Sequence, residues 1–132
     1  MKFIKTNFTW IVVAVIGIIF GAQQLQAADG IDVTQAQSIN KQGALLLDVR
    51  ETGEYAEVHA PNATLIPLGE LGARLNEIAA YKDKPIAVVC RSGRRSAKAV
   101  GILQEAGFSQ VSNVSGGMTA WESAGLEVVR KQ

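Results

Sequence analysis

Two largely apolar runs mark the middle of the chain. Residues Ala44–Val49 and Pro85–Cys90 are bounded by glycine or charged residues, a pattern typical of strands buried on both faces of a sheet. Over residues 71–80 the apolar positions recur at i, i+4, i+7 and i+8, which predicts an amphipathic helix there.

The remaining segments alternate between helical and strand patterns. A capping-box pattern at residues 34–37 predicts a helix that follows Val33 and ends near Gly43. Further helices are predicted at 51–58, 97–106 and 118–124, a turn at 61–62, and short strands at 111–114 and 128–129. This alternation favours an α/β fold in which a parallel sheet carries helices on both faces.

The N-terminal segment has the order of a secretory signal. Lys2 and Lys5 precede an apolar run at residues 10–22, and small residues follow at Ala27 and Ala28. We therefore expect a signal peptide over residues 1–27 and a periplasmic or otherwise exported domain over residues 28–132. A membrane-spanning helix needs about 20 apolar residues, so the run at residues 10–22 is short for a permanent anchor. An uncleaved anchor through these residues is the alternative, and membrane contact is expected only in that case.

Composition narrows the class of protein. The 132 residues are 48% hydrophobic and 19% charged, as in an ordinary single globular domain. A net charge of +1 creates no strong field toward nucleic acid or anionic membranes, so no nucleic-acid partner is predicted. One cysteine and one histidine cannot form an intramolecular disulfide or a structural zinc site, and no metal is predicted.

The single cysteine stands where chemistry is expected in such a fold. Cys90 ends a predicted buried strand, and ligands of parallel sheets bind beyond the carboxyl ends of the strands. Residues 91–96 then lead into a helix, so backbone N–H groups point inward and Gly93 can take a positive φ. The helix dipole and three arginines add positive charge, which favours a nucleophilic thiolate and binding of a small oxyanion. A buried structural cysteine beside a solvated loop is the alternative, but it does not explain the arginines and the glycine.

Four segments resemble motifs of the rhodanese domain. They are residues 46–50 (LLDVR), 59–63 (HAPNA), 90–96 (CRSGRRS) and 116–121 (GGMTAW). The resemblance spans about residues 32–130. It implies an α/β three-layer sandwich around a five-stranded parallel sheet. It also implies a thiosulfate sulfurtransferase that carries sulfur as a persulfide on Cys90, without a metal or an organic cofactor.

Within this resemblance the loop supplies the binding groups. The predicted substrate-binding residues are Arg91, Ser92, Gly93, Arg94, Arg95, Ser96 and Arg50. Backbone N–H groups of residues 91–95 would stabilise the persulfide charge. Arg91 is the first candidate to bind the sulfonate of the sulfur donor and Arg95 the second, whereas Arg94 fits a solvated role equally well. Arg50 could line the mouth of the site or pair with Glu51 or Glu54.

Three further residues are predicted to support the site rather than to react. Asp48 ends a buried strand and is expected to accept hydrogen bonds from loop N–H groups or from an arginine. His59 is expected to be a structural histidine rather than the base of a Cys–His pair. Trp121 is expected in the core rather than against the substrate.

Competing functions are weighed by loop length. A cysteine-based phosphatase or arsenate reductase needs an arginine six residues after the cysteine, and Ser96 stands there. A non-catalytic partner-binding module is a further alternative, although such modules often lose the cysteine.

The expected partners are a small sulfur donor, thiosulfate or a persulfide, and a thiophilic acceptor, which is cyanide, a small thiol or a thiol protein.

Overall fold

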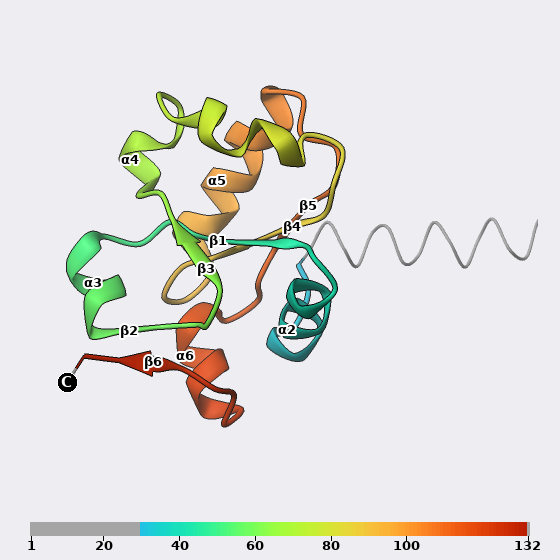
Figure 1. Ribbon diagram of the computed structural model, residues 1–132. Coiled ribbons are helices and arrows are strands. Elements are labelled where there is room, and N and C mark those ends of the chain that lie inside the picture. The colour runs from blue at the N-terminus through green and yellow to red at the C-terminus, as the bar shows by residue number, and fades with distance from the viewer. Residues whose placement is uncertain (1–29, 132) are drawn as a thin grey trace, which may run out of the picture.

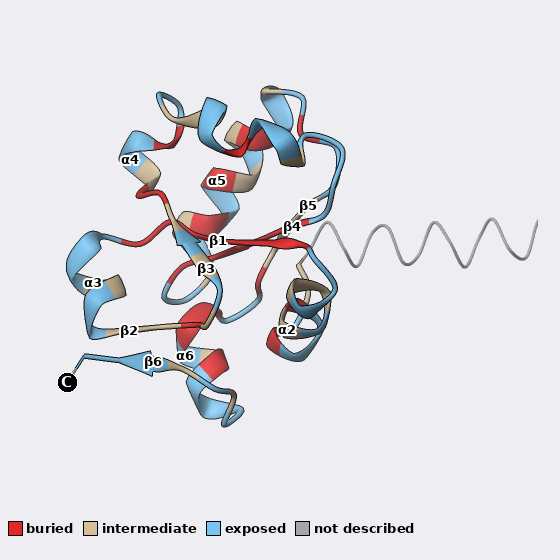
Figure 2. Ribbon diagram, viewed as in Figure 1, coloured by how far each residue is buried: buried red, intermediate tan, exposed pale blue. Residues whose placement is uncertain are grey.

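The central layer of the protein is a sheet of four parallel strands, as the computed structural model describes it over residues 30–131 (Figure 1). Its strands are β1 (Leu45–Asp48), β3 (Ala63–Leu65), β4 (Ile86–Val89) and β5 (Val111–Asn113). They lie in the order β3-β1-β4-β5, so the two apolar runs of the sequence form the central strands. Every residue of β1 and β4 is buried (Figure 2). The predicted α/β class is confirmed.

Helices cover both faces of this sheet. They are α2 (Val33–Lys41), α3 (Thr52–Glu57), α4 (Leu68–Leu71), the 3-10 helix η1 (Leu75–Tyr81), α5 (Arg94–Glu105) and α6 (Gly117–Ser123). Leu45 and Leu47 pack with α4, η1 and α5, whereas Leu46 packs with α2 and α6, because alternate side chains of a strand face opposite layers. Figure 1 shows these two groups of helices on opposite sides of the sheet.

The main sheet has four strands, not the five that the resemblance to the rhodanese domain implies. Ile31 makes a single parallel bridge with Val114, in which its N–H donates to the carbonyl of Asn113 at 2.8 Å. The next residue, Asp32, already caps α2 by accepting a hydrogen bond from the Gln35 N–H at 2.7 Å. The helix therefore begins two residues after the bridge, and its cap ends the pairing. The capping box consequently lies at residues 32–35, two residues before the predicted position.

The last predicted strand belongs to a separate ribbon. β6 (Val129–Arg130) pairs antiparallel with β2 (Val58–His59) rather than joining the main sheet. The Lys131 N–H continues this pairing by donating to the carbonyl of Glu57 at 3.0 Å. The C-terminal end of the described chain is thus fixed against the end of α3.

The predicted helix over residues 71–80 is replaced by α4 and η1. Within η1, Leu75, Ile78 and Tyr81 stand three residues apart and all contact the same apolar cluster. The segment is kinked at Ile78, whose φ of −118° and ψ of 16° are not helical, so it does not form one regular helix. The predicted export signal over residues 1–27 lies outside the described part of the chain. Within residues 30–131, no helix has the length and apolar character needed to cross a bilayer.

Candidate active site

Cys90 lies at the carboxyl end of β4, where a three-residue loop leads into α5. Gly93 precedes the helix with a φ of 106°, a conformation that is accessible to glycine and costly for other residues. This turn lets α5 begin at Arg94, three residues before the predicted start at residue 97. The first turn of the helix therefore faces the sulfur. The Cys90 residue is 1% exposed and contacts the apolar cluster beneath the loop.

Hydrogen bonds converge on the sulfur of Cys90. The N–H of Gly93 lies 3.0 Å from Sγ, and the hydroxyl of Ser96 lies 3.3 Å from it. Burial alone would raise the pKa of Cys90. The Ser96 hydroxyl and the backbone N–H groups of Ser96, Gly93 and Ser92 together outweigh burial and lower this pKa below its ordinary value. The loop therefore favours the thiolate, which is the nucleophilic form of cysteine.

The start of α6 holds the loop from the opposite side. The N–H of Met118 donates to the carbonyl of Cys90 at 2.8 Å, and the N–H of Thr119 donates to the carbonyl of Arg91 at 3.1 Å. A side chain at Gly117 would collide with both carbonyl groups, and its φ of 56° is also left-handed. Gly117 is thus required by a close approach of two backbones.

The three arginines of the loop have different surroundings. Arg95 forms a two-pronged ion pair with Glu54 of α3, with distances of 2.6 and 2.9 Å from its Nη atoms to the carboxylate oxygens. These hydrogen bonds lower the pKa of Glu54 from 4.5 to about 2, although burial acts in the opposite direction. Arg91 and Arg94 are exposed, and within residues 30–131 neither forms an ion pair.

A groove of about 540 Å³ runs beside the loop, between α3 and α6. Arg91 and Arg50 contribute to its wall, together with Glu54, Glu57 and Glu122. Cys90 itself does not line this groove, so the groove lies beside the cysteine loop rather than over the sulfur. Its mixed charges suit a polar molecule that approaches the loop from the side.

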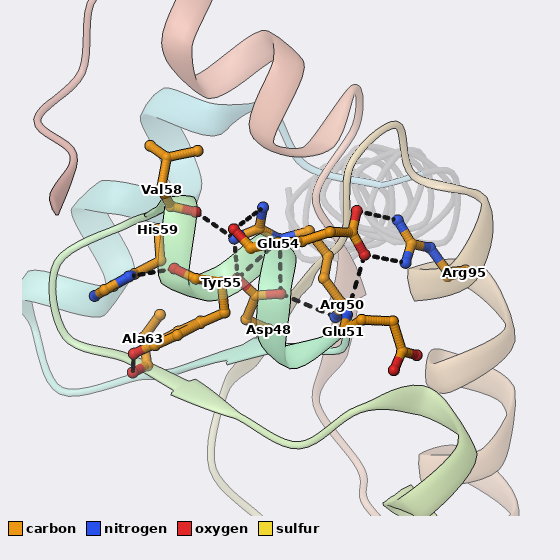
Figure 3. A network of polar contacts seen from close by, with 9 residues as sticks. All are labelled: Asp48, Arg50, Glu51, Glu54, Tyr55, Val58, His59, Ala63 and Arg95. Carbon is orange, nitrogen blue, oxygen red and sulfur yellow. Dashed lines mark hydrogen bonds and ion pairs between the residues drawn. The ribbon is translucent and has the colours of Figure 1, made fainter. Parts of the chain in front are cut away.

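Arg50 is buried, and its guanidinium group is held by hydrogen bonds to neighbouring residues (Figure 3). Its Nε and Nη2 atoms donate to the carboxylate of Asp48 at distances of 2.8 to 3.1 Å. Nη2 also donates to the carbonyl of Val58 at 2.7 Å. Asp48 additionally accepts the N–H of Arg50 at 3.0 Å. This pair joins the end of β1 to α3 and β2.

The other two predicted support residues lie apart from the sulfur. The His59 ring stacks on Tyr55 with centroids 3.8 Å apart, and its Nδ1 lies 2.8 Å from the Tyr55 carbonyl oxygen, to which it donates (Figure 3). Trp121 is 1% exposed, and its Nε1 donates to the carbonyl of Glu127 at 2.9 Å. The structure records no hydrogen bond from either side chain to Cys90 among the described residues.

Sequence reasoning missed two residues of the site. Glu54 stands 41 residues before Arg95, and nothing in the spacing of the sequence pairs them. Asn113 contacts both Gly93 and Ser96 from the end of β5. The sequence could have indicated Asn113, because it is a polar residue at the carboxyl end of a strand that neighbours the strand before Cys90.

The site thus consists of a cysteine at the carboxyl end of a central parallel strand, beside the start of a helix. Residues 32–124 match the family of the rhodanese-like domain. The chain therefore belongs to the rhodanese-like family.

Relatives in this family carry names that describe sulfur transfer. A sulfurtransferase of Allochromatium vinosum is 38% identical over 85 residues, which are 64% of this chain and 78% of that protein. The thiosulfate sulfurtransferase GlpE of Pseudomonas syringae is 36% identical over 89 residues, which are 67% of this chain and 82% of that protein. Bacillus subtilis YrkF, whose name includes the words sulfur carrier protein, is 43% identical, but the chain spans only 40% of its length.

Solved structures agree with this assignment. The rhodanese-related protein of Thermoplasma volcanium is 34% identical and superimposes with a TM-score of 0.66. The superposition covers 76% of this chain and 96% of that chain. The three-layer arrangement described above is thus the arrangement of the family.

Replacing Gly117 should disturb the cysteine loop. We expect Gly117→Ala to lower the free energy of unfolding by about 1–3 kcal/mol, because the methyl group meets the carbonyls of Cys90 and Arg91 at a left-handed φ. Alkylation of Cys90 by iodoacetamide should also become faster as the loop moves. Gly72→Ala is the matched control, since Gly72 has a φ of −58° and open space around it. Equal effects of the two substitutions in urea unfolding would contradict the close-approach argument.

The Glu54–Arg95 pair should make stability depend on acid pH. Because the pKa of Glu54 falls on folding, the pair stabilises the protein fully above pH 4.5 and loses this contribution as the pH falls toward about 2. In Glu54→Gln the urea midpoint should therefore change less between pH 4.5 and 2 than in the parent. Glu105→Gln, at the exposed end of α5, should keep the parent's pH dependence. Parallel curves for the parent and Glu54→Gln would refute the role of the pair.

Proposed function

We propose that the protein is a sulfurtransferase that accepts a sulfane sulfur on Cys90. The thiolate attacks the outer sulfur of thiosulfate or of a persulfide donor, and a new S–S bond forms. With thiosulfate, the old S–S bond breaks and sulfite leaves with its electron pair, so Cys90 carries a persulfide anion. The observation that carries this proposal is the set of hydrogen-bond donors around Sγ, which lowers the pKa of Cys90.

A second step returns the cysteine to its starting state. A thiophilic acceptor attacks the outer persulfide sulfur, and the Cys90 thiolate leaves. Cyanide becomes thiocyanate in this step, and a thiolate becomes a persulfide. The covalent sulfur is the only carrier in this cycle, so we propose no metal or organic cofactor. Sulfur-transfer partners in general are supported by the names of relatives such as YrkF, and an acceptor thiol on another protein is part of the proposal.

Arg91 is the proposed binding group for the sulfonate of the donor. It is exposed at the groove beside the loop, whereas Arg95 would first have to leave Glu54. Arg95 is the second candidate, and Ser92, Gly93 and Ser96 act through hydrogen bonds to the sulfur. Arg50 is held by Asp48, so we assign it to shaping the groove wall.

The position of Ser96 argues against phosphatase or arsenate reductase activity. It stands six residues after Cys90, where those enzymes have a clamping arginine, and its buried hydroxyl lies 3.3 Å from Sγ. The loop therefore surrounds one sulfur atom closely instead of enclosing a tetrahedral anion with a guanidinium group. This geometry favours sulfur over phosphorus or arsenic chemistry.

The segment before the domain is proposed to direct export. If residues 1–27 are a cleaved signal, N-terminal sequencing of protein from the cell envelope should give a mature chain that begins near Ala28. Intact Met1 in the membrane fraction would instead indicate an anchor. Recovery from the cytoplasm alone would end the export proposal.

Sulfur loading should require the thiol of Cys90. Cys90→Ser should fold, because it preserves the size of the side chain, but it should not gain a sulfur atom after treatment with thiosulfate. Intact-mass spectrometry of the parent should show one added sulfur, which cyanide then removes as thiocyanate. Sulfur transfer that persists in Cys90→Ser would exclude the covalent mechanism.

Arg91 should act mainly on the first half-reaction. Arg91→Ala should weaken the use of thiosulfate by about 1–3 kcal/mol, the usual loss for one charge-assisted hydrogen bond. Discharge of a preformed persulfide by cyanide should change less. Arg94→Ala is the matched control, since Arg94 is also exposed and removes the same charge from the loop. Equal losses in both half-reactions, or in both variants, would assign Arg91 to general electrostatics instead of donor binding.

A further inference from the structure

Asn113 lies behind the cysteine loop with both ends of its amide engaged. It is the last residue of β5 and pairs in register with Val88 of β4. Its Nδ2 lies 3.0 Å from the carbonyl oxygen of Gly93, and its Oδ1 lies 2.5 Å from the hydroxyl of Ser96. The carbonyl of Gly93 can only accept a hydrogen bond, so the NH₂ group must face it. The Oδ1 atom of Asn113 therefore faces Ser96 as an acceptor.

This orientation creates a competition for one proton. The hydroxyl of Ser96 has a single proton and two acceptors within reach, Oδ1 of Asn113 at 2.5 Å and Sγ of Cys90 at 3.3 Å. While Cys90 is a neutral thiol, the better arrangement is a chain in which S–H donates to the Ser96 oxygen and Ser96 donates to Asn113. Once the sulfur is negative, the same hydroxyl is drawn to the sulfur, because hydrogen bonds to charged acceptors are stronger.

The geometry points to Asn113 as a positioning residue. Its Oδ1 accepts the hydrogen bond of the Ser96 hydroxyl while Cys90 is a neutral thiol, and this hydroxyl turns to the sulfur when the sulfur becomes negative. In this step the Cys90 thiol gives its proton to solvent or base, while the Ser96 hydroxyl keeps its own proton and rotates from one acceptor to the other. Asn113 thus stabilises the thiol relative to the thiolate, and at the same time it fixes the Gly93 carbonyl at the start of α5. The inference concerns the same cysteine as the proposed function, but its test measures ionisation and needs no turnover.

The experiment compares the ionisation of Cys90 in variants of Asn113. Cys90 is the only cysteine, so the ultraviolet absorbance of the thiolate against pH, taken as the difference from Cys90→Ser, reports on this residue. Asn113→Ala removes the competing acceptor and should raise the acid dissociation constant of the thiol about three- to tenfold, as expected for one hydrogen bond. Asn113→Leu, which preserves volume, should act in the same direction. Asn113→Asp keeps the acceptor and adds negative charge, so it should lower the constant.

A second background separates positioning from simple support of the loop. Ser96→Ala removes the hydroxyl, and in that background Asn113→Ala should leave the dissociation constant unchanged. If Asn113 only braced the loop, its loss would misplace the N–H donors and make the thiol less acidic. A decrease or no change in Asn113→Ala and Asn113→Leu would therefore overturn the proposal, as would the same shift in both backgrounds. Failure of sulfur loading with these ionisation results intact would count against the proposed function alone.

The charged groups around the sulfur stay constant in this comparison. In the loop, in the groove beside it and in the ion pairs of its arginines they are Arg91, Arg94 and Arg95, Asp48 and Arg50, Glu54 and Glu57 from α3, and Glu122 from α6. Neither Asn113→Ala nor Asn113→Leu alters any of these charges. An increase in the acidity of Cys90 that is absent in the Ser96→Ala background is therefore assigned to the Ser96 hydroxyl.

Discussion

The contact between the first residues of α6 and the backbone of Cys90 and Arg91 sets the direction of the whole loop. A trans peptide unit is planar and its C=O and N–H point in opposite directions. Because the carbonyl of Arg91 points to the N–H of Thr119, the following N–H, that of Ser92, points away from α6. This is the side of the sulfur, where the Ser92 N–H contributes to lowering the pKa of Cys90. Gly117, the first residue of α6, thus permits a contact that orients the backbone around a cysteine more than 20 residues earlier in the chain.

The parts of the fold that could be predicted are those in which local pattern and tertiary packing agree. The buried strands β1 and β4 are apolar runs, and the sequence predicts them within one or two residues. The region of α4 and η1 was not predicted correctly. Its apolar residues between 68 and 81 fit both a three-residue and a four-residue spacing, and the packing of Ile78 in the apolar cluster decides between them. The resemblance implies five strands, and the main sheet has only four for another reason. Asp32 is a strong helix cap, and it ends the extended segment directly after Ile31.

The sequence predicts the residues of the cysteine loop, but not the residues elsewhere in the chain that pair with them. The cysteine, the glycine and the arginines are contiguous, so their roles follow from a strand, a turn and a helix start. The partners of those arginines come from elsewhere in the chain, and a sequence without spatial information cannot supply them. Glu54 neutralises Arg95, and Asp48 does the same for Arg50, so the formal positive charge of the region overstates what a bound anion would meet. The acidity of Cys90 consequently depends on hydrogen bonds from the start of α5 more than on formal charge.

The burial of Cys90 affects where the reactive atom would stand during the proposed cycle. At 1% exposure, the resting cysteine is shielded from large oxidants and from flat protein surfaces. An S–S bond is about 2 Å long, so a persulfide would place its terminal sulfur up to about that distance farther from the β4 backbone. Loading would then place the sulfur atom that the acceptor attacks farther from the interior than the cysteine sulfur itself. An acceptor too bulky to reach the empty cysteine could still meet the sulfur that it carries, so the two half-reactions need not have the same steric limits.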